Sequence, residues 1–154
     1  MIYQLWNSLN KWPMGRCIFN LLIHWMVPYT GTIHPQVLEM EPGRSCVKIK
    51  DRRRVRNHLQ SIHAVALMNL GEAASGLAVM SSIPANARAI LTHLEIDFLK
   101  KARGPLTAIG EFKSTATDYS KNKDYDASAS IYNEAKEEVA RVKALWRIGP
   151  WKRN

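Results

Sequence analysis

The chain has 154 residues, of which 46% are hydrophobic and 23% charged, a composition typical of a globular protein with one domain. Its 22 basic and 13 acidic residues give a net charge of +9, which favours anionic partners such as nucleic acid, an acidic membrane surface or a phosphorylated small molecule. Cys17 and Cys46 belong to no CxxC pair or zinc-ligand cluster. The sequence therefore predicts no bound metal and a reduced, cytoplasmic setting.

The apolar pattern of residues 1–30 predicts a helical arm, which precedes a main domain at residues 31–150. Apolar residues recur there at helical spacing in two stretches, which Pro13-Met14-Gly15 interrupts and Pro28 ends. These residues are Ile2, Leu5, Trp6 and Leu9, followed by Ile18, Phe19, Leu21, Leu22, Trp25 and Met26. We expect the arm to pack on the core, and a role of its Trp residues in binding a partner or forming a lid is the alternative.

A strand pair and one long helix are predicted next. Residues 37–40 and 45–50 have strand character and flank a turn at residues 41–44, and a basic run at residues 52–56 follows. Residues 62–80 predict a buried central helix, because they are apolar on nearly every face and rich in small residues. This stretch is long enough to cross a membrane, but Glu72 at its middle makes that costly, so no membrane-spanning segment is expected.

Four further strands are predicted after the helix, at residues 89–101, 106–117, 127–132 and 139–148. Arg103-Gly104-Pro105 indicates a turn, residues 118–126 a polar loop, and residues 133–136 the turn of a hairpin. The pattern predicts an α+β fold in which an antiparallel sheet wraps around one long helix. Neither GxGxxG nor GxxxxGK[ST] occurs, so the two common phosphate-loop folds have no support.

Polar residues at the start of the central helix predict a reaction site. Asn57, His58, Ser61 and His63 cluster where free backbone N–H groups meet the positive end of the helix dipole. Such a helix start can stabilise negative charge that develops on a carbonyl oxygen. Alternatively, Ser61 only caps the helix and the two histidines are solvated.

Glu72 is the second part of this predicted site. An acid in an apolar helix is rarely kept without a partner or a task, so Glu72 is a candidate general base or nucleophile. The alternative is a structural acid that is bound to local backbone or to Asn69. Eight residues separate Glu72 from Ala64, roughly 12 Å along a helix. One helix cannot bring both to one carbonyl, whereas two antiparallel copies can, which predicts a dimer with composite sites.

Residues 57–72 resemble the helix motif of hotdog-fold acyl-CoA thioesterases, in particular the phenylacetyl-CoA and 4-hydroxybenzoyl-CoA thioesterase-like groups. In that motif an Asn or Gln precedes His-Gly-Gly by six residues and an Asp or Glu by fifteen, and Asn57, His63 and Glu72 match these positions. Ala64 and Val65 stand where the motif has its two glycines. The resemblance extends over about residues 33–148. The segments 100–105 and 146–148 resemble an uncharacterised thioesterase-like branch of the superfamily.

The resemblance implies a curved sheet around a long helix, and a homodimer or dimer of dimers with its sites at the subunit interface. It implies that Glu72 is the base or nucleophile, that the Ala64 amide contacts the oxyanion, and that Asn57 and His63 complete the catalytic set. The side chains of Ala64 and Val65 narrow the pocket, which favours slim acyl chains.

The same resemblance implies how the substrate is bound. Val65, His58 and Asn69 line the substrate site, and basic side chains hold the phosphates of coenzyme A, which enters only as part of the substrate and not as a cofactor. The basic residues are Arg54, Arg56, Lys100, Lys101 and Arg103. A solvated basic face is the alternative for them.

Three other functions compete with thioester hydrolysis. The fourteen-residue spacing of His58 and Glu72 is that of hotdog hydroxyacyl dehydratases, but residues 59–71 lack the proline expected there. A non-catalytic acyl-CoA binder would keep Glu72 as a structural residue. Nucleic-acid binding by residues 48–56 is disfavoured because no aromatic residues are interleaved with the basic ones. We therefore expect acyl-CoA and a second copy of the chain as partners, with no nucleic acid and no membrane.

Overall fold

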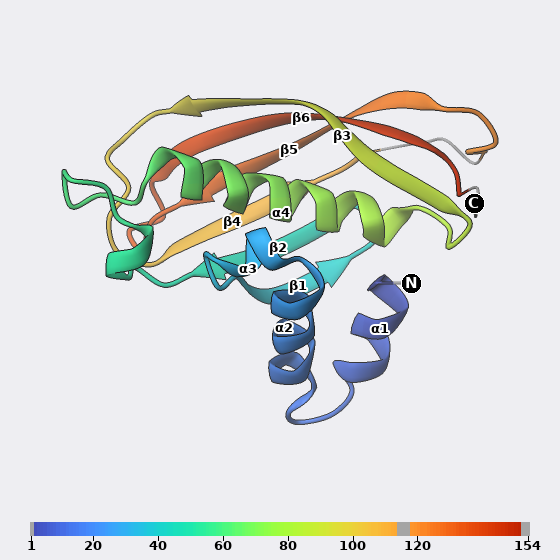
Figure 1. Ribbon diagram of the computed structural model, residues 1–154, viewed down its shortest axis with the longest axis horizontal. Coiled ribbons are helices and arrows are strands. Elements are labelled where there is room, and N and C mark those ends of the chain that lie inside the picture. Colours follow the sequence, from blue (N-terminus) through green and yellow to red (C-terminus); the bar gives the residue numbers. More distant parts are fainter. Residues whose placement is uncertain (1, 114–117, 152–154) are drawn as a thin grey trace.

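The computed structural model describes residues 2–113 and 118–151 of the chain. Its helices and strands follow one another as Figure 1 shows. They are α1 (Ile2–Leu9), α2 (Gly15–Met26), α3 (Pro28–Gly31), β1 (Gln36–Glu41), β2 (Arg44–Ile49), the 3-10 turn η1 (Arg53–Val55), α4 (Ala64–Ser82), β3 (Ala87–Phe98), β4 (Leu106–Glu111), β5 (Lys123–Tyr132) and β6 (Glu138–Pro150).

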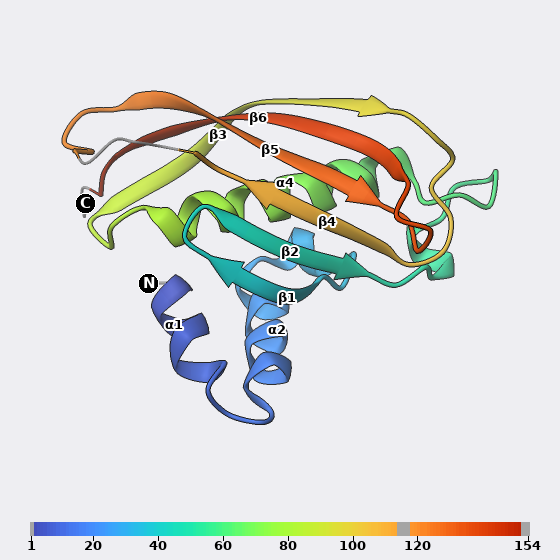
Figure 2. The same ribbon diagram turned by 180° about the vertical axis from the view of Figure 1, so that it is seen from behind.

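The six strands form one antiparallel sheet in the order β1-β2-β4-β5-β6-β3. The sheet curves around α4, which lies along its concave side, as the two opposite views in Figures 1 and 2 show. This confirms the predicted α+β architecture of an antiparallel sheet around one long helix. The two outer strands are β1 and β3, which lie at opposite edges.

Small residues allow α4 to lie directly against the sheet. The carbonyl oxygen of Ala74 accepts a hydrogen bond of 2.7 Å from the buried hydroxyl of Ser45 on β2. A Cβ atom on Gly110 of β4 would lie 2.2 Å from the same oxygen. Gly71 and Gly76 likewise allow α4 to approach the side chains of β6. A Cβ atom on Gly71 would collide with the Val142 side chain. The small-residue pattern of the sequence therefore reflects helix-to-sheet contact.

The predicted turns are confirmed, and two predicted segments differ. Gly43 in the β1–β2 turn and Lys136 in the β5–β6 turn have positive φ values of 80° and 60°. The prediction of a loop over residues 118–126 is wrong at its end, because β5 already begins at Lys123. Strand pairing with β6 and an ion pair of 2.8 Å between Asp124 and Arg147 compensate for the polar composition there. The strand predicted at residues 106–117 ends at Glu111, and residues 114–117 lie outside the described residues.

The N-terminal helices pack beside β1 and over part of α4 (Figure 1). Trp6 and Phe19 hold α1 and α2 together, with ring centroids 5.0 Å apart in an edge-to-face arrangement. Asn20 bonds to both polar backbone groups of Val37, accepting from its N–H at 2.8 Å and donating to its carbonyl at 3.5 Å. The arm thus packs on the core as expected and covers part of the outer edge of β1.

By length and hydropathy, α4 would qualify as a membrane span, but 67% of that stretch is buried within the fold. Its apolar character is explained by the sheet that surrounds it.

The closest approach of helix and sheet gives a stability prediction. Gly110→Ala should lower the free energy of unfolding by about 1–3 kcal/mol, because the new methyl group meets the Ala74 carbonyl and the Ser45 hydroxyl. Urea denaturation measures the change. Glu111→Ala on the same strand is exposed and should stay within about 0.5 kcal/mol of wild type. Equal stability of the two variants would contradict the packing argument.

Candidate functional site

The N-terminus of α4 is capped by His63 and not by Ser61. The backbone of His63 is extended, with φ −64° and ψ 141°, and its Nδ1 atom accepts a hydrogen bond of 3.1 Å from the Val65 amide. The alternative that Ser61 caps this helix is therefore wrong, and its buried hydroxyl has no partner among the described residues. The Ala64 N–H has no acceptor in the part of the chain that the structure describes. A free amide thus stands at the start of α4.

Asn57 organises the loop that leads into α4. Its Oδ1 atom accepts hydrogen bonds from the amides of Leu59 and Ser61, at 2.9 and 3.1 Å. The Asn57 amide in turn donates to the Ser61 carbonyl at 2.8 Å. These three bonds close a tight loop, and two of them occupy the side-chain oxygen of Asn57. His58 is exposed on this loop.

One stripe of α4 faces away from the sheet and carries Val65, Asn69 and Glu72. Asn69 is 5% exposed, and its Nδ2 group donates to the carbonyl of Tyr29 in α3 at 3.3 Å. Its Oδ1 atom is buried and receives no hydrogen bond from any described residue. A buried acceptor without a donor is unusual, and it makes Asn69 a candidate contact for a ligand.

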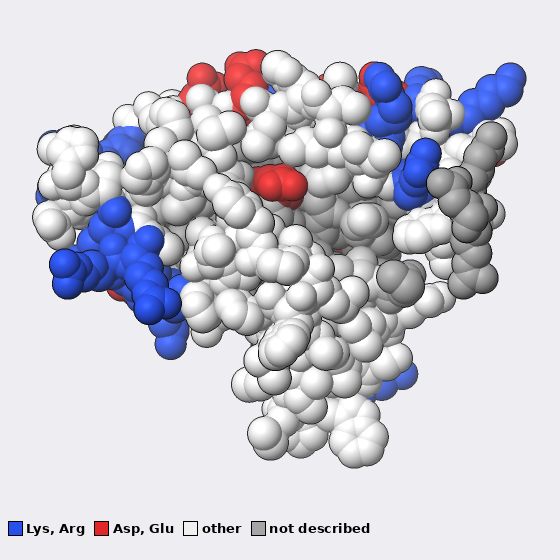
Figure 3. Space-filling model, in the orientation of Figure 1, with Lys and Arg blue, Asp and Glu red and all other residues white. Residues whose placement is uncertain are grey.

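Glu72 is half-buried, and its carboxylate contacts no hydrogen-bond donor or basic side chain among the described residues. Burial therefore raises the pKa of Glu72 without an opposing interaction. Glu72 is the one charged residue of α4, and Figure 3 shows a single acidic group over this helix within an uncharged face. The alternative in which Asn69 holds Glu72 is not observed, because Asn69 bonds to Tyr29.

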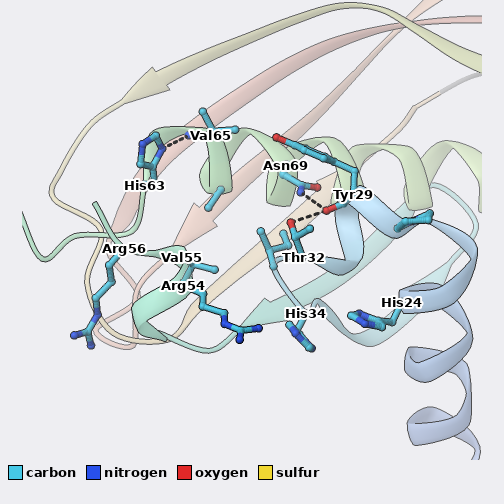
Figure 4. A pocket seen from close by; sticks show the side chains of 13 residues that line it. His24, Tyr29, Thr32, His34, Arg54, Val55, Arg56, His63, Val65 and Asn69 are labelled. Atoms are coloured by element: carbon cyan, nitrogen blue, oxygen red, sulfur yellow. Dashed lines mark hydrogen bonds between the residues drawn. The ribbon is translucent and has the colours of Figure 1, made fainter. Parts of the chain in front are cut away.

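Two separate cavities open along this side of α4. The larger, about 830 Å³, surrounds the start of the helix and includes His63, Val65 and Asn69 (Figure 4). The smaller, about 180 Å³, surrounds Glu72 and is otherwise almost wholly apolar. The N-terminal arm supplies walls to both. Its contributions are His24, Pro28 and Tyr29 to the larger cavity, and Ile2, Ile23, Val27 and Thr30 to the smaller one.

The larger cavity is basic. The rings of His24 and His34 are stacked with centroids 4.6 Å apart, and no carboxylate lines the cavity. Figure 4 shows Arg54 extending toward these histidines, whereas Arg56 points away. Partial desolvation, and then the positive charges of Arg52, His24 and Arg54, lower the pKa of His34. The basic lining of this cavity favours the binding of an anionic group.

The other predicted phosphate-binding residues are placed differently. Lys100 pairs with Glu137 at 2.6 Å, on the exposed surface. Arg56 pairs with Asp51 at 2.6 Å and holds the pKa of that carboxyl below its usual range. Lys101 and Arg103 are exposed and do not line the large cavity. Arg54 and Arg56 both line the large cavity, but only Arg56 is paired with an acid; Arg54 forms no ion pair among the described residues.

Several site residues were not identified from the sequence. His24, Tyr29 and His34 lie in or next to the arm, and nothing in their spacing links them to residues 57–72. Trp146 on β6 lines the Glu72 cavity, and its indole N–H is buried without an acceptor among the described residues. Only the tertiary contacts of α4 with the arm and β6 reveal these positions.

The start of α4 and Glu72 do not meet within one chain. Ala64 and Glu72 are eight residues apart on one continuous helix, or about 12 Å along its axis. The cavities that contain the helix start and Glu72 are distinct. Among the described residues, no cluster of three or more His, Cys, Asp or Glu side chains is suited to a metal ion.

The raised pKa of Glu72 gives a pH-dependent stability prediction. Below the ordinary pKa of a glutamate, Glu72 is neutral in both the folded and unfolded states; above its folded pKa, folding must desolvate a charge. Glu72→Gln should therefore be more stable than wild type at neutral pH, with the difference closing in acid. Urea denaturation at neutral pH and at a pH below the ordinary pKa of a glutamate, with the same protein concentration at both, measures the difference in stability. Exposed Glu134→Gln serves as the control, and a gap that does not change with pH would contradict the burial argument.

Known proteins with solved structures share this architecture. The crystal structure described as genomics APC5556 has a TM-score of 0.82 and 27% identity, covering 97% of this chain and 99% of that one. PA5026 of Pseudomonas aeruginosa, named a probable thioesterase, has a TM-score of 0.76 and 18% identity, covering 86% of this chain and 93% of that one. The protein smu.793 of Streptococcus mutans UA159, solved with acetyl CoA bound, has a TM-score of 0.66 and 18% identity, covering 77% of this chain and 91% of that one.

No curated protein matches the sequence. The model of the family described as "Domain of unknown function (DUF4442)" matches residues 15–148. The match covers α2, the whole sheet except the last two residues of β6, and the Asn57-to-Glu72 segment. The chain therefore belongs to the DUF4442 family, and its fold is the hotdog fold that thioesterase-family structures share.

Proposed function

We propose that this protein hydrolyses the thioester bond of an acyl-CoA. The observation that carries the proposal is Glu72, a half-buried acid of raised pKa without a bonding partner among the described residues, on the same open stripe of α4 as a free helix N-terminus. Structures of the same fold support the reaction class, since PA5026 is named a probable thioesterase and smu.793 was solved with acetyl CoA. A carboxylate in an apolar site and a polarised carbonyl are what thioester hydrolysis needs.

In the proposed reaction, the Ala64 N–H donates to the thioester carbonyl oxygen and stabilises the negative charge that develops there. Glu72 takes a proton from water, and the water oxygen bonds to the carbonyl carbon. Breakage of the carbon–sulfur bond gives the carboxylic acid and a thiolate, which receives the proton from Glu72. Direct attack of Glu72 on the carbonyl carbon is the alternative route. His63 positions the helix start through its cap on Val65.

We propose that the two halves of this site come from two copies of the chain, because one helix keeps them about 12 Å apart. Among the described residues, strand β3 pairs with β6 along one side only and leaves twelve residues of free edge, where Ile90 and Phe98 are about half exposed. An unpaired strand edge presents free backbone N–H and C=O groups, which tend to pair with another strand. Antiparallel pairing of β3 with its symmetry mate would continue the sheet into the partner and bring the two α4 helices toward each other.

The two cavities suit the two ends of an acyl-CoA. The basic cavity, with Arg54 and the His24–His34 pair, would take the phosphates, and the apolar cavity beside Glu72 would take the acyl chain. Arg56, Lys100, Lys101 and Arg103 would then contribute longer-range charge. We propose Val65 and Asn69 as contacts near the thioester, with the free Oδ1 of Asn69 accepting from a substrate N–H.

Removal of a single N–H tests the oxyanion role. Ala64→Pro deletes the amide hydrogen at the first position of α4, where proline fits a helix, and the extended backbone of His63 is already suitable before proline. We expect kcat to fall about 100- to 1,000-fold while the melting temperature is kept. Released CoA, followed with a thiol reagent over a panel of acyl-CoAs, measures the rate.

Ala64→Gly keeps the N–H and is the matched control, which should stay within about tenfold of wild type. Equal activity of the proline and glycine variants would remove the Ala64 amide from the mechanism. Tight acyl-CoA binding by a wild-type protein that hydrolyses no member of the panel would favour the non-catalytic binder.

Mixed dimers test whether the site is shared between chains. Glu72→Gln and Ala64→Pro should each be inactive alone, because each loses one half of every site. After denaturation and joint refolding, about half of the dimers are mixed and carry one intact composite site out of two, so about a quarter of wild-type activity should return. No recovery, with mixed dimers verified by differently tagged subunits, would place both groups in one chain.

A further inference from the structure

The outer face of the N-terminal arm is strongly apolar and exposed. Trp12 and Met14, at the turn between α1 and α2, are 72% and 70% exposed. Leu21 and Trp25 on α2 are 60% and 77% exposed. A single exposed apolar residue is ordinary, but a cluster of large ones on a projecting element indicates a contact surface.

Helix α2 is apolar on two opposite faces. Phe19 and Ile23 point inward and are almost completely buried. Ile18, Leu21 and Trp25 recur at spacings of three and four residues on the outward side, which nothing in the described chain covers. Large apolar side chains that are exposed together on one helix face indicate a contact surface, so the outer face of α2 is suited to a further partner.

The arm holds this face in a fixed position. A Cβ atom on Gly15 would lie 1.6 Å from the Leu9 carbonyl oxygen, so α1 and α2 are in direct backbone contact. The Trp6–Phe19 contact and the two bonds between Asn20 and Val37 attach the pair to the body of the fold. The arm projects from the sheet in both ribbon views (Figures 1 and 2). The apolar face is thus a built feature of the folded chain.

The charge of the arm narrows the choice of partner. Residues 1–38 contain no Asp or Glu. The exposed cations Lys11 and Arg16 flank the apolar turn at Trp12 and Met14. Figure 3 shows no acidic group on the visible face of the arm. Tryptophan and tyrosine side chains favour the boundary between lipid and water, and nearby lysine and arginine are attracted to anionic headgroups.

We propose that the α1–α2 arm docks on the surface of an anionic lipid bilayer, with Trp12 and Met14 inserted at the headgroup level. A second copy fits less well, because two such arms would bring like charges together. The arm also packs beside β1, at the edge of the sheet opposite to β3. The expectation of no membrane partner rested on the lack of a spanning segment, and surface docking does not require one.

The lipid contact itself does not depend on the proposed thioester hydrolysis, and a binding experiment without acyl-CoA separates the two.

Vesicle sedimentation of the full chain tests the proposal. We expect the wild-type protein to bind vesicles of phosphatidylcholine mixed with phosphatidylglycerol, and to bind pure phosphatidylcholine vesicles at least about tenfold more weakly. Added salt should weaken binding to the mixed vesicles, because it screens the contribution of Lys11 and Arg16.

Two pairs of variants separate the apolar and charged parts. Trp12→Ala with Met14→Ala should lower the partition coefficient at least about tenfold, because both side chains lose their apolar burial. Trp151→Ala, which removes an exposed Trp outside the arm, is the control and should have no effect. Lys11→Gln with Arg16→Gln should lower binding to the anionic vesicles about tenfold. Lys113→Gln with Lys121→Gln removes the same charge elsewhere and should change it much less.

Three results would overturn the proposal. The first is the absence of vesicle binding by a wild-type protein whose circular dichroism shows a folded chain. The second is equal binding to the two vesicle types. The third is an oligomer that light scattering detects without lipid and that the Trp12→Ala, Met14→Ala variant no longer forms. That result would make a second copy the occupant of this face.

Discussion

The close packing of α4 into the concave sheet is the constraint on which the rest of the structure depends. The Ala74 carbonyl lies against Gly110 and bonds to the Ser45 hydroxyl, so no larger residue fits at this contact. Because the sheet covers most of the helix, one stripe faces away from it, and the candidate site residues of α4 lie on this stripe. The position of Val65, Asn69 and Glu72 thus follows from how the helix is buried.

The N-terminal arm gives this open stripe its chemical character. Its α3 turn bonds to Asn69 through the Tyr29 carbonyl, and the space around α4 is divided between a basic cavity at the helix start and an apolar cavity at Glu72. An acyl-CoA has the same division, with a phosphorylated end and an apolar end. The arm therefore lines both cavities of the proposed acyl-CoA site and also has an exposed face of its own.

The isolation of Glu72 is costly and so points to function. Desolvation raises its pKa, and the described chain offers no cation or donor in return. The helix start that would complete a reaction site is about 12 Å away along the same helix. The proposed pairing of two chains along the free edge of β3 would resolve both difficulties, because it would bring a second helix start toward the acid.

The sequence by itself determined the central helix, the strand pairs around their glycine and asparagine turns, and the spacing of Asn57, His63 and Glu72, because these depend on local periodicity and turn chemistry. Tertiary structure decided that His63 and not Ser61 caps α4, that β5 begins at Lys123, and that His24, His34 and Tyr29 join the site. It also decided that Lys100 and Arg56 are paired with acids while Arg54 faces a cavity. These outcomes depend on contacts between residues far apart in the chain, which no local pattern encodes.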